Sequence, residues 1–506
     1  MMLRKRATTQ TYSRPHLSKK SRKEEEDMIT QLPEDVRRHI LSFLSTKHAV
    51  STTILSRSWK NLWTLASTKN LELDDSILLH PESNSETIHH HPSLFSDFVN
   101  RVLGLISVPC IQTLKLCCSY PYDPDHINCW LHTACKYNVS EVNIRVYGQN
   151  PIKLPSNLYG STWLVVLKLN ANVSLDFRDS ISFPRLKVLW IKVYDTNDVN
   201  LTQKLFRDHI CPILEELFIE GEILDENSRV VLLVILSSLK RLKIEYRLAH
   251  SFQGGIEYNF VLHCPNLECL DLRDDFLAKY SARDLKVLDY AKISIGYPCA
   301  DYAAFDLYGD VNPSNRAFEV LKELSNVKSL SLSGGTTKAL SCSYETAQHT
   351  GLDDDDEDAL LIRLRNFELY FRFLTFLELG FRTCESWSLL PLLLHSSPNV
   401  EYLILKKELD LTSCRYKTVF FWRPEGPVPE CMSLHLREIE IWGFQGESQE
   451  LATVEFFLGH AEVLQKMTIH VQEASPNMMF SEHVLQIPRV SEACEVEIIS
   501  TKSCIQ

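Results

Sequence analysis

The chain has 506 residues, more than one compact hydrophobic core normally holds, so several domains or an extended repeat array are expected. It carries 53 basic residues (Lys and Arg) against 65 acidic ones. Eight of the basic residues and no acidic one lie in the first 23 positions, so the remainder has 45 basic and 65 acidic residues and should repel nucleic acid.

The fifteen cysteines indicate reduced thiols rather than a disulfide framework. No C-x-x-C pair occurs, and no apolar signal segment opens the sequence. The longest apolar run, residues 230–236, is far shorter than the roughly twenty residues that cross a bilayer. We therefore expect neither disulfides nor a membrane partner.

Residues 1–27 form a basic segment that is expected to be disordered. It holds two groups of cations separated by twelve residues, a layout that resembles a bipartite nuclear import signal. The candidates are Arg4, Lys5, Arg6, Lys19, Lys20, Arg22 and Lys23. A solubilising tail is the alternative, so residence in the nucleus, the cytoplasm or both stays open.

Residues 28–68 predict three short helices with apolar faces. Pro33 suits the first helical turn, and the apolar residues Val36, Ile40, Phe43 and Leu44 follow one another at spacings of four, three and one. Thr46 and Ser56 are expected to cap the second and third helices. About forty residues bury too little surface to fold alone, and two close tryptophans are costly to leave in water. The segment is therefore expected to be completed by another protein.

The ordered residues of this segment resemble the F-box of plant proteins: Leu32-Pro33, Ile40-Leu41-Ser42-Phe43-Leu44, Thr46-Lys47, Ala49-Val50 and Leu55-Ser56-Arg57 to Trp63. The resemblance implies docking onto a Skp-type adaptor and, through it, a cullin. We expect the adaptor contact at Leu32, Pro33, Ile40, Leu41, Leu44, Val50, Leu55, Trp59, Leu62 and Trp63. Some of these must also hold the helices together. A helical hairpin that packs on the rest of the chain is the alternative.

Residues 69–110 are interpreted as a linker and a first irregular unit. His80 and the run His89-His90-His91 could bind a metal, but adjacent histidines lack a fixed chelating geometry. A flexible insertion is therefore favoured, and no metal site or cofactor is expected.

Residues 111–420 repeat one pattern, apolar at the first, fourth and sixth positions. Regular copies begin at residues 111, 139, 164, 186, 214, 239 and 267, and later copies at residues 327, 374 and 400. The same pattern continues beyond this region at residues 436 and 464. This is the strand signature of leucine-rich repeats, in which each unit stacks a short parallel strand on its neighbour. The fold class is thus α/β: a small all-α F-box, then an irregular solenoid with strands on one face and helices on the other.

An insertion is expected at residues 333–359, between two of the later copies. It contains Gly334-Gly335 and the acidic run Asp353-Asp354-Asp355-Asp356-Glu357-Asp358. Like charges in a row are typical of a solvated loop, and a basic partner or a divalent cation is the alternative.

Residues 421–500 resemble the FBD domain of plant F-box proteins. The resemblance rests on four groups of residues: Val428-Pro429-Glu430-Cys431, Gly443-Phe444-Gln445-Gly446, Phe456-Phe457-Leu458 and Ile487-Pro488-Arg489-Val490-Ser491. Its apolar spacing predicts a strand, a helix and a second strand. We interpret this region as a cap on the end of the solenoid.

The sequence lacks the phosphate-binding loop, the zinc helix and the nucleophile turn that mark common enzymes. The adjacent Cys117 and Cys118 are expected to pack rather than to do redox chemistry. These absences give no sign of catalysis, and the resemblance to F-box proteins implies a non-catalytic substrate-recognition subunit of a Skp-cullin-F-box ubiquitin ligase. A small-molecule co-receptor on the same scaffold and a ligase-independent scaffold are the alternatives.

Overall fold

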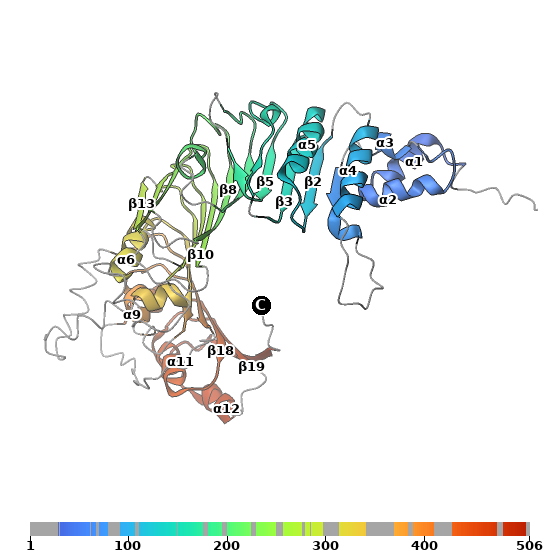
Figure 1. Ribbon diagram of the computed structural model, residues 1–506. Helices are drawn as coiled ribbons and strands as arrows, with labels where there is room; N and C mark the ends of the chain where they lie inside the picture. The colour runs from blue at the N-terminus through green and yellow to red at the C-terminus, as the bar shows by residue number, and fades with distance from the viewer. Residues whose placement is uncertain are drawn as a thin grey trace, which may run out of the picture.

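The structure is a computed structural model of the chain. It describes residues 29, 31–60, 62–66, 70–78, 92–106, 111–148, 150–175, 181–194, 200–223, 229–248, 257–275, 279–283, 285–296, 313–340, 369–382, 387, 389–408, 428–472 and 479–501. These residues form an arc, with the N-terminal helices at one end and β19 and α12 at the other (Figure 1).

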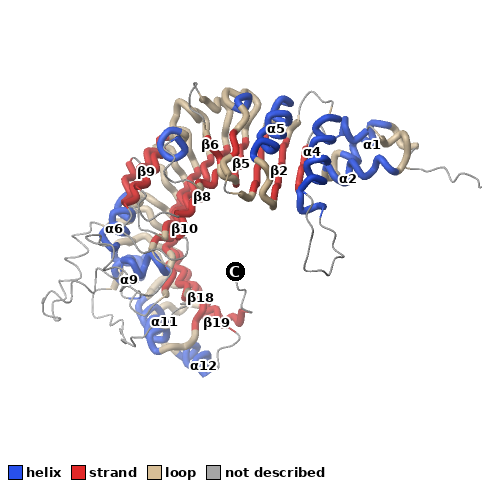
Figure 2. Tube along the Cα trace, in the orientation of Figure 1, coloured by secondary structure: helices blue, strands red, loops and turns tan. Residues whose placement is uncertain are grey.

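A fifteen-stranded parallel sheet runs through the described part of the chain, each strand pairing with the next one along the arc. Strands lie on the inner side of the arc and helices on the outer side (Figure 2). The strands are β1 (Asn70–Asp74), β2 (Thr113–Cys118), β3 (Glu141–Val146), β5 (Val166–Asn170), β7 (Val188–Val193), β8 (Glu216–Ile223), β10 (Arg241–Leu248), β12 (Cys269–Asp274), β14 (Tyr290–Ile295), β15 (Ser329–Leu332), β16 (Phe376–Phe381), β17 (Tyr402–Lys407), β18 (Glu438–Phe444), β19 (Lys466–Gln472) and β20 (Glu495–Thr501).

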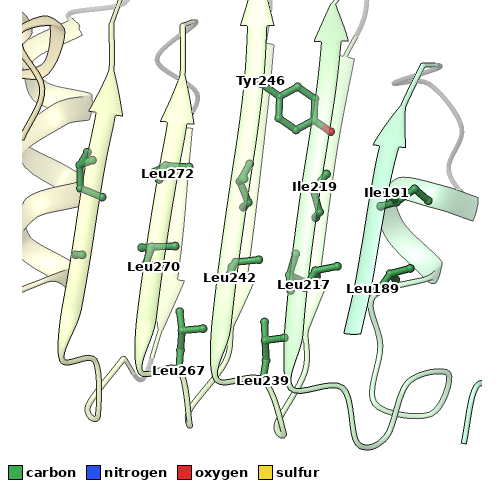
Figure 3. Packing of buried hydrophobic residues seen from close by; sticks show 14 of the residues in the cluster. Leu189, Ile191, Leu217, Ile219, Leu239, Leu242, Tyr246, Leu267, Leu270 and Leu272 are labelled. Atoms are coloured by element: carbon green, nitrogen blue, oxygen red, sulfur yellow. The ribbon is translucent and has the colours of Figure 1, made fainter. Parts of the chain in front are cut away.

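The repeat pattern predicted this sheet, and all twelve strands expected from it form. Its fourth and sixth positions make continuous buried rows across the strands, as Leu217, Leu242 and Leu270 do on the neighbouring strands β8, β10 and β12 (Figure 3). Because every unit buries its apolar face only against its neighbours, the core is one continuous cluster along the arc.

The outer side is helical at both ends of the arc, as the repeat pattern predicted. Its helices are α4 (Pro92–Leu105), α5 (Pro124–Ala134), α6 (Pro313–Glu323), α9 (Leu389–His395), α10 (Glu430–Leu434), α11 (Ser448–His460) and α12 (Met479–Gln486). Shorter elements complete the outer side: β4 (Ile152–Lys153) paired with β6 (Val173–Ser174), the 3₁₀ turns η2 (Asp75–Leu78), η3 (Cys135–Tyr137) and η4 (Ser156–Leu158), and the π-helical turn η5 (Asn200–Lys204).

In the middle of the arc, strands replace the expected helices on the outer side. A second parallel sheet joins β9 (Arg229–Ile235), β11 (Glu257–His263) and β13 (Lys279–Arg283). The apolar run at residues 230–236 explains the change, because four of its seven residues are β-branched and such side chains favour the pleated surface of a sheet over a helix.

The three helices of the F-box segment form, with boundaries that differ from the predicted ones. They are α1 (Glu34–Leu41), α2 (Thr46–Ser51), followed by the 3₁₀ turn η1 (Thr52–Ile54), and α3 (Leu62–Ala66). Trp59 precedes α3 in a turn, and Thr46 does not cap α2. The Thr46 hydroxyl is buried and instead accepts the Glu72 N–H of β1, at 2.8 Å.

The region expected as an insertion at residues 333–359 begins with helix rather than loop. Residues 334–340 are helical and place Ala339 and Leu340 in the core, so this part of the prediction is wrong. The acidic run 353–358 lies outside the described residues. At the C-terminal end, β18, β19 and β20 extend the same sheet, so the FBD-type region forms the last turns of the solenoid.

Within the described ranges, no helix has both the length and the apolar character that a membrane crossing requires.

Candidate functional site

Four of the ten residues expected to contact an adaptor are buried in the protein's own core. Trp59 is 2% exposed and Trp63 is 3% exposed, and Leu41 and Leu62 are covered as well. These four belong to the same cluster as Leu71 of β1, so the solenoid completes the F-box core. The expectation that the tryptophans face a partner is therefore wrong: α1 and α3 pack on each other, α2 packs on β1, and both rings lie inside.

Other apolar residues of the F-box segment stay exposed after this core is complete. Phe43 is 76% exposed and Ile54 is 86% exposed. Exposed with them are four of the expected contact residues: Pro33, Ile40, Leu44 and Leu55. Leu32 and Val50 are half-buried. We name Pro33, Ile40, Phe43, Leu44, Ile54 and Leu55 the exposed F-box set.

Phe43 and Ile54 are the members that the sequence did not single out as contacts. Phe43 stood in the apolar pattern of the first predicted helix, but its spacing did not distinguish a covered position from an open one. Phe43 follows the end of α1, where its ring lies edge-on to His39 at 4.8 Å, and Ile54 ends η1.

Arg37 holds the segment between α1 and α3 in place. Its Nε donates to the Leu32 carbonyl at 3.0 Å, and its Nη1 donates to the Ser58 carbonyl at 3.2 Å. The guanidinium also lies over the Trp59 ring, 5.7 Å from its centroid. Arg37 thus joins the residue before Pro33 to the turns before α3.

The inner face of the sheet is the second candidate surface. Alternate strand residues point away from the core, so they line the concave side of the arc. In the middle of this face the charges neutralise one another: Lys192 Nζ lies 3.3 Å from Glu220 Oε1, and Arg241 pairs with Glu216. Glu245 forms ion pairs with three cations, Lys243, Arg247 and Arg273.

The ion pairs of Glu245 favour the charged form of its carboxylate. Partial burial opposes the charge of the carboxylate, but the hydrogen bond and charge of Arg247, with the nearby Lys243 and Arg273, hold the pKa of Glu245 below its usual range. The middle of the concave face is therefore charged but balanced.

The cysteine thiols in the core are poor nucleophiles. Burial raises the pKa of both Cys117 and Cys118, and it raises the pKa of Cys211 and Cys264 to about 12. A protonated, covered thiol does not react readily. In the described part of the chain, no three His, Cys, Asp or Glu side chains gather as metal ligands would. The histidines considered as metal ligands in the sequence, His80 and His89–His91, lie outside the described residues.

A groove of about 430 Å³ lies at the rim of the sheet, where the chain enters β8, β10, β12 and β14. Ile213 and Val287 are apolar, but the rest of the lining is polar or charged: Glu215, Ser238, Lys240, Asn266 and Glu268. Small-molecule sites enclose most of their ligand, whereas this groove is open to solvent. Its open shape gives little support to the small-molecule alternative.

Comparison with known proteins identifies the family. The model of the F-box domain matches residues 29–70, and the model of the FBD domain matches residues 423–469. The F-box/LRR-repeat protein At4g14103 of Arabidopsis thaliana is 31% identical over 388 residues, covering 75% of this chain and 91% of that protein. The chain belongs to the F-box/LRR-repeat family.

Other members of the F-box/LRR-repeat family match over most of their length. The F-box/LRR-repeat protein At4g14096 of Arabidopsis thaliana is 29% identical, covering 94% of this chain and 95% of that protein. The F-box/FBD/LRR-repeat protein At4g26340 of the same plant is 29% identical, covering 87% and 91%. The resemblances to the F-box and the FBD domain seen in the sequence are confirmed.

Proposed function

We propose that this F-box/LRR-repeat protein is the substrate-recognition subunit of a Skp-cullin-F-box ubiquitin ligase. The F-box docks a Skp-type adaptor, which joins the chain to a cullin, and the concave face of the repeats holds a target protein. One observation supports the docking most directly: Phe43 and Ile54 stay exposed although the F-box core is already filled. Exposed apolar groups of this size are typical of protein interaction sites.

The proposed mechanism is proximity and needs no catalytic residue in this chain. An interface of about 800 Å² per partner would hold the adaptor. The solenoid would keep the target's lysines near the conjugating enzyme and so raise their effective concentration. The transfer of ubiquitin belongs to that enzyme.

The test is co-purification of the full chain with a Skp-type adaptor. The Phe43→Ala, Ile54→Ala double variant should lose adaptor affinity by at least about tenfold, because buried apolar anchors dominate interface energies. The control is Leu94→Ala with Leu105→Ala on α4, where both leucines are 58% exposed outside the F-box. Equal binding by the two double variants would contradict the proposal.

A third variant separates docking from folding. Trp63→Ala should lower the melting temperature, because it opens a cavity in the shared core at a cost of about 3–5 kcal/mol. Loss of adaptor binding by this variant alone would report unfolding. The Phe43 and Ile54 variant should keep the wild-type melting temperature.

The two alternatives to this function give different results in the same assay. A small-molecule co-receptor would capture its target only when a ligand is added. A ligase-independent scaffold would bind its target but would not co-purify a cullin. We further propose that the basic residues at positions 4–6 and 19–23, outside the described residues, direct the chain to the nucleus.

A further inference from the structure

The strand face of β18, β19 and β20 differs from the middle of the concave face in its charge balance. Its outward positions carry four carboxylates and one ammonium group: Glu438, Glu440, Glu495, Glu497 and Lys466. With His470 neutral, these groups sum to three negative charges. We name this surface the acidic strand face.

Lys466 cannot neutralise this surface. Its Nζ lies 3.0 Å from Glu497 Oε2, and this hydrogen bond, with the added charges of Glu438 and Glu495, raises the pKa of Lys466. Among the described residues, neither Glu438 nor Glu495 has an ion-pair partner within 4.0 Å. Glu245 in the middle of the arc, by contrast, pairs with several cations.

An aromatic residue lies within the acidic strand face. Trp442 is 37% exposed, and its Nε1 donates to Glu440 Oε2 at 2.9 Å. One face of its ring stacks on His470, with ring centroids 3.5 Å apart and an interplanar angle of 10°. A tryptophan fixed in this way offers a rigid surface to a partner.

His470, on the same surface, has a buried ring nitrogen that lacks a hydrogen-bond partner. The side chain occupies an outward strand position and is only 8% exposed, yet its Nδ1 has no hydrogen-bond partner. Its Nε2 lies 3.9 Å from Glu440 Oε2. Burial lowers the pKa of His470 against the opposing pull of Glu440, so the ring is neutral near pH 7 and adds no positive charge. Buried polar atoms without a partner are rare in folded proteins.

We propose that the acidic strand face binds a basic segment of the target protein. An arginine or lysine side chain lies against the open part of Trp442 next to Glu440, where a cation gains from both the ring and the carboxylate. Further cations pair with Glu438 and Glu495, which lie on strands two apart in the sheet. This proposal rests on the proposed function in one respect: the protein that carries the basic segment is taken to be a target of the ligase.

The experiment measures fluorescence anisotropy of a labelled peptide of alternating arginine and glycine titrated with the full chain. A peptide with glutamate in place of arginine should not bind. The Glu438→Gln, Glu495→Gln variant should weaken binding of the arginine peptide about three- to tenfold, with a smaller loss at high salt. Failure of the wild-type chain to bind the arginine peptide would overturn the proposal.

Two controls separate a specific surface from general attraction to an acidic protein. Glu462→Gln with Glu482→Gln makes the same change in net charge at exposed positions outside this face and should leave affinity within about twofold of wild type. Trp442→Ala keeps the charge but removes the ring, and should weaken binding about two- to tenfold, with Trp442→Phe in between. Equal losses in the two glutamine variants, or no loss in Trp442→Ala, would overturn the proposal.

These results do not depend on the adaptor. If the arginine peptide binds as expected but the adaptor does not co-purify, the proposed ligase function fails while the acidic strand face stands. If the adaptor co-purifies and the arginine peptide does not bind, the proposal for the acidic strand face fails while the proposed ligase function stands. Melting temperatures of the two glutamine variants should match the wild type, because the substituted carboxylates are not buried.

Discussion

The ring of Tyr246 occupies the space in which Gly221 would carry a side chain. The two residues are partners in the register of β10 and β8, and a β-carbon built on Gly221 would lie 2.4 Å from a ring carbon of Tyr246. Tyr246 is fully buried in the layer of inward side chains shown in Figure 3. The glycine therefore leaves the space that allows an aromatic ring into this row, whose other members are Val193, Asp274 and Ile295.

Gly221→Ala should destabilise the protein by about 1–3 kcal/mol, because the ring of Tyr246 is packed on all sides and cannot move aside. The measurement is the melting temperature. The control is Gly459→Ala in α11, where the added carbon would meet no atom within 4 Å apart from its chain neighbours and the nearby backbone of the same helix. That change should stabilise the helix by about 0.5–1 kcal/mol. Stabilisation by both substitutions would contradict the packing at Gly221.

Tyr246→Phe should leave stability unchanged or raise it by up to about 1 kcal/mol, because the buried Tyr246 hydroxyl has no hydrogen-bond partner. Tyr280→Phe is the matched control. Its hydroxyl donates to Asp274, a carboxylate that is also buried, so removing it should cost about 1–3 kcal/mol. Denaturant midpoints of the two variants should move in different directions or by clearly different amounts. Equal destabilisation would show that the Tyr246 hydroxyl has a partner.

Thr46→Val should loosen the attachment of the F-box to the solenoid. The Thr46 hydroxyl accepts the Glu72 N–H at 2.8 Å, and valine keeps the shape but removes the acceptor, at a cost of about 1–2 kcal/mol. Hydrogen exchange at the Glu72 amide should become faster. Thr52→Val, which removes a bond to the nearby Ala49 carbonyl, should leave that amide protected. Unchanged exchange in Thr46→Val would rule out this link.

Stability should fall as the pH drops below about 6.5, in part because of His470. Burial lowers the pKa of His470 in the folded chain, so the unfolded chain binds the proton more readily. Its contribution is complete above the ordinary histidine pKa and is lost as the pH falls toward the lowered one. In His470→Gln, the loss of melting temperature between pH 8 and pH 5 should be smaller than in wild type. Identical pH profiles would exclude this contribution.

Replacing Lys19, Lys20, Arg22 and Lys23 with alanine should shift a fluorescently tagged full chain from the nucleus to the cytoplasm, if these cations form an import signal. Imaging of living plant cells measures the ratio of nuclear to cytoplasmic fluorescence. The control replaces the acidic residues Glu24, Glu25 and Glu26, which follow in the same segment. An unchanged ratio in the alanine variant would favour a solubilising tail.

The repeat strands could be predicted because their signal is local and periodic. Leu217 and Ile219 recur in phase with the same positions of every regular unit. β14 was missed because Ala291 stands where other units carry a large apolar residue, and the flanking Leu288 and Ile293 did not complete the pattern. The outer sheet was missed because a run of apolar residues is compatible with either a buried helix or a strand.

The F-box shows where sequence reasoning stopped. Trp63 and Phe43 are both large apolar residues in the same short motif. Trp63 is buried in the shared core, whereas Phe43 is exposed to solvent. Their spacing along the chain did not distinguish them. The acidic strand face also escaped notice, because Glu438 and Glu495 are 57 residues apart and meet only through the register of β18, β19 and β20.

By itself, the sequence determined the order of the parts: a basic segment, an F-box, a leucine-rich solenoid and an FBD region. This order can be seen in short motifs and in the spacing of the repeats, which are local features of the sequence and do not depend on how distant segments pack. Only the tertiary structure decided which apolar residues are covered and which charges lack a partner. Burial and charge balance depend on which distant segments pack together, and packing is a property of the folded chain as a whole.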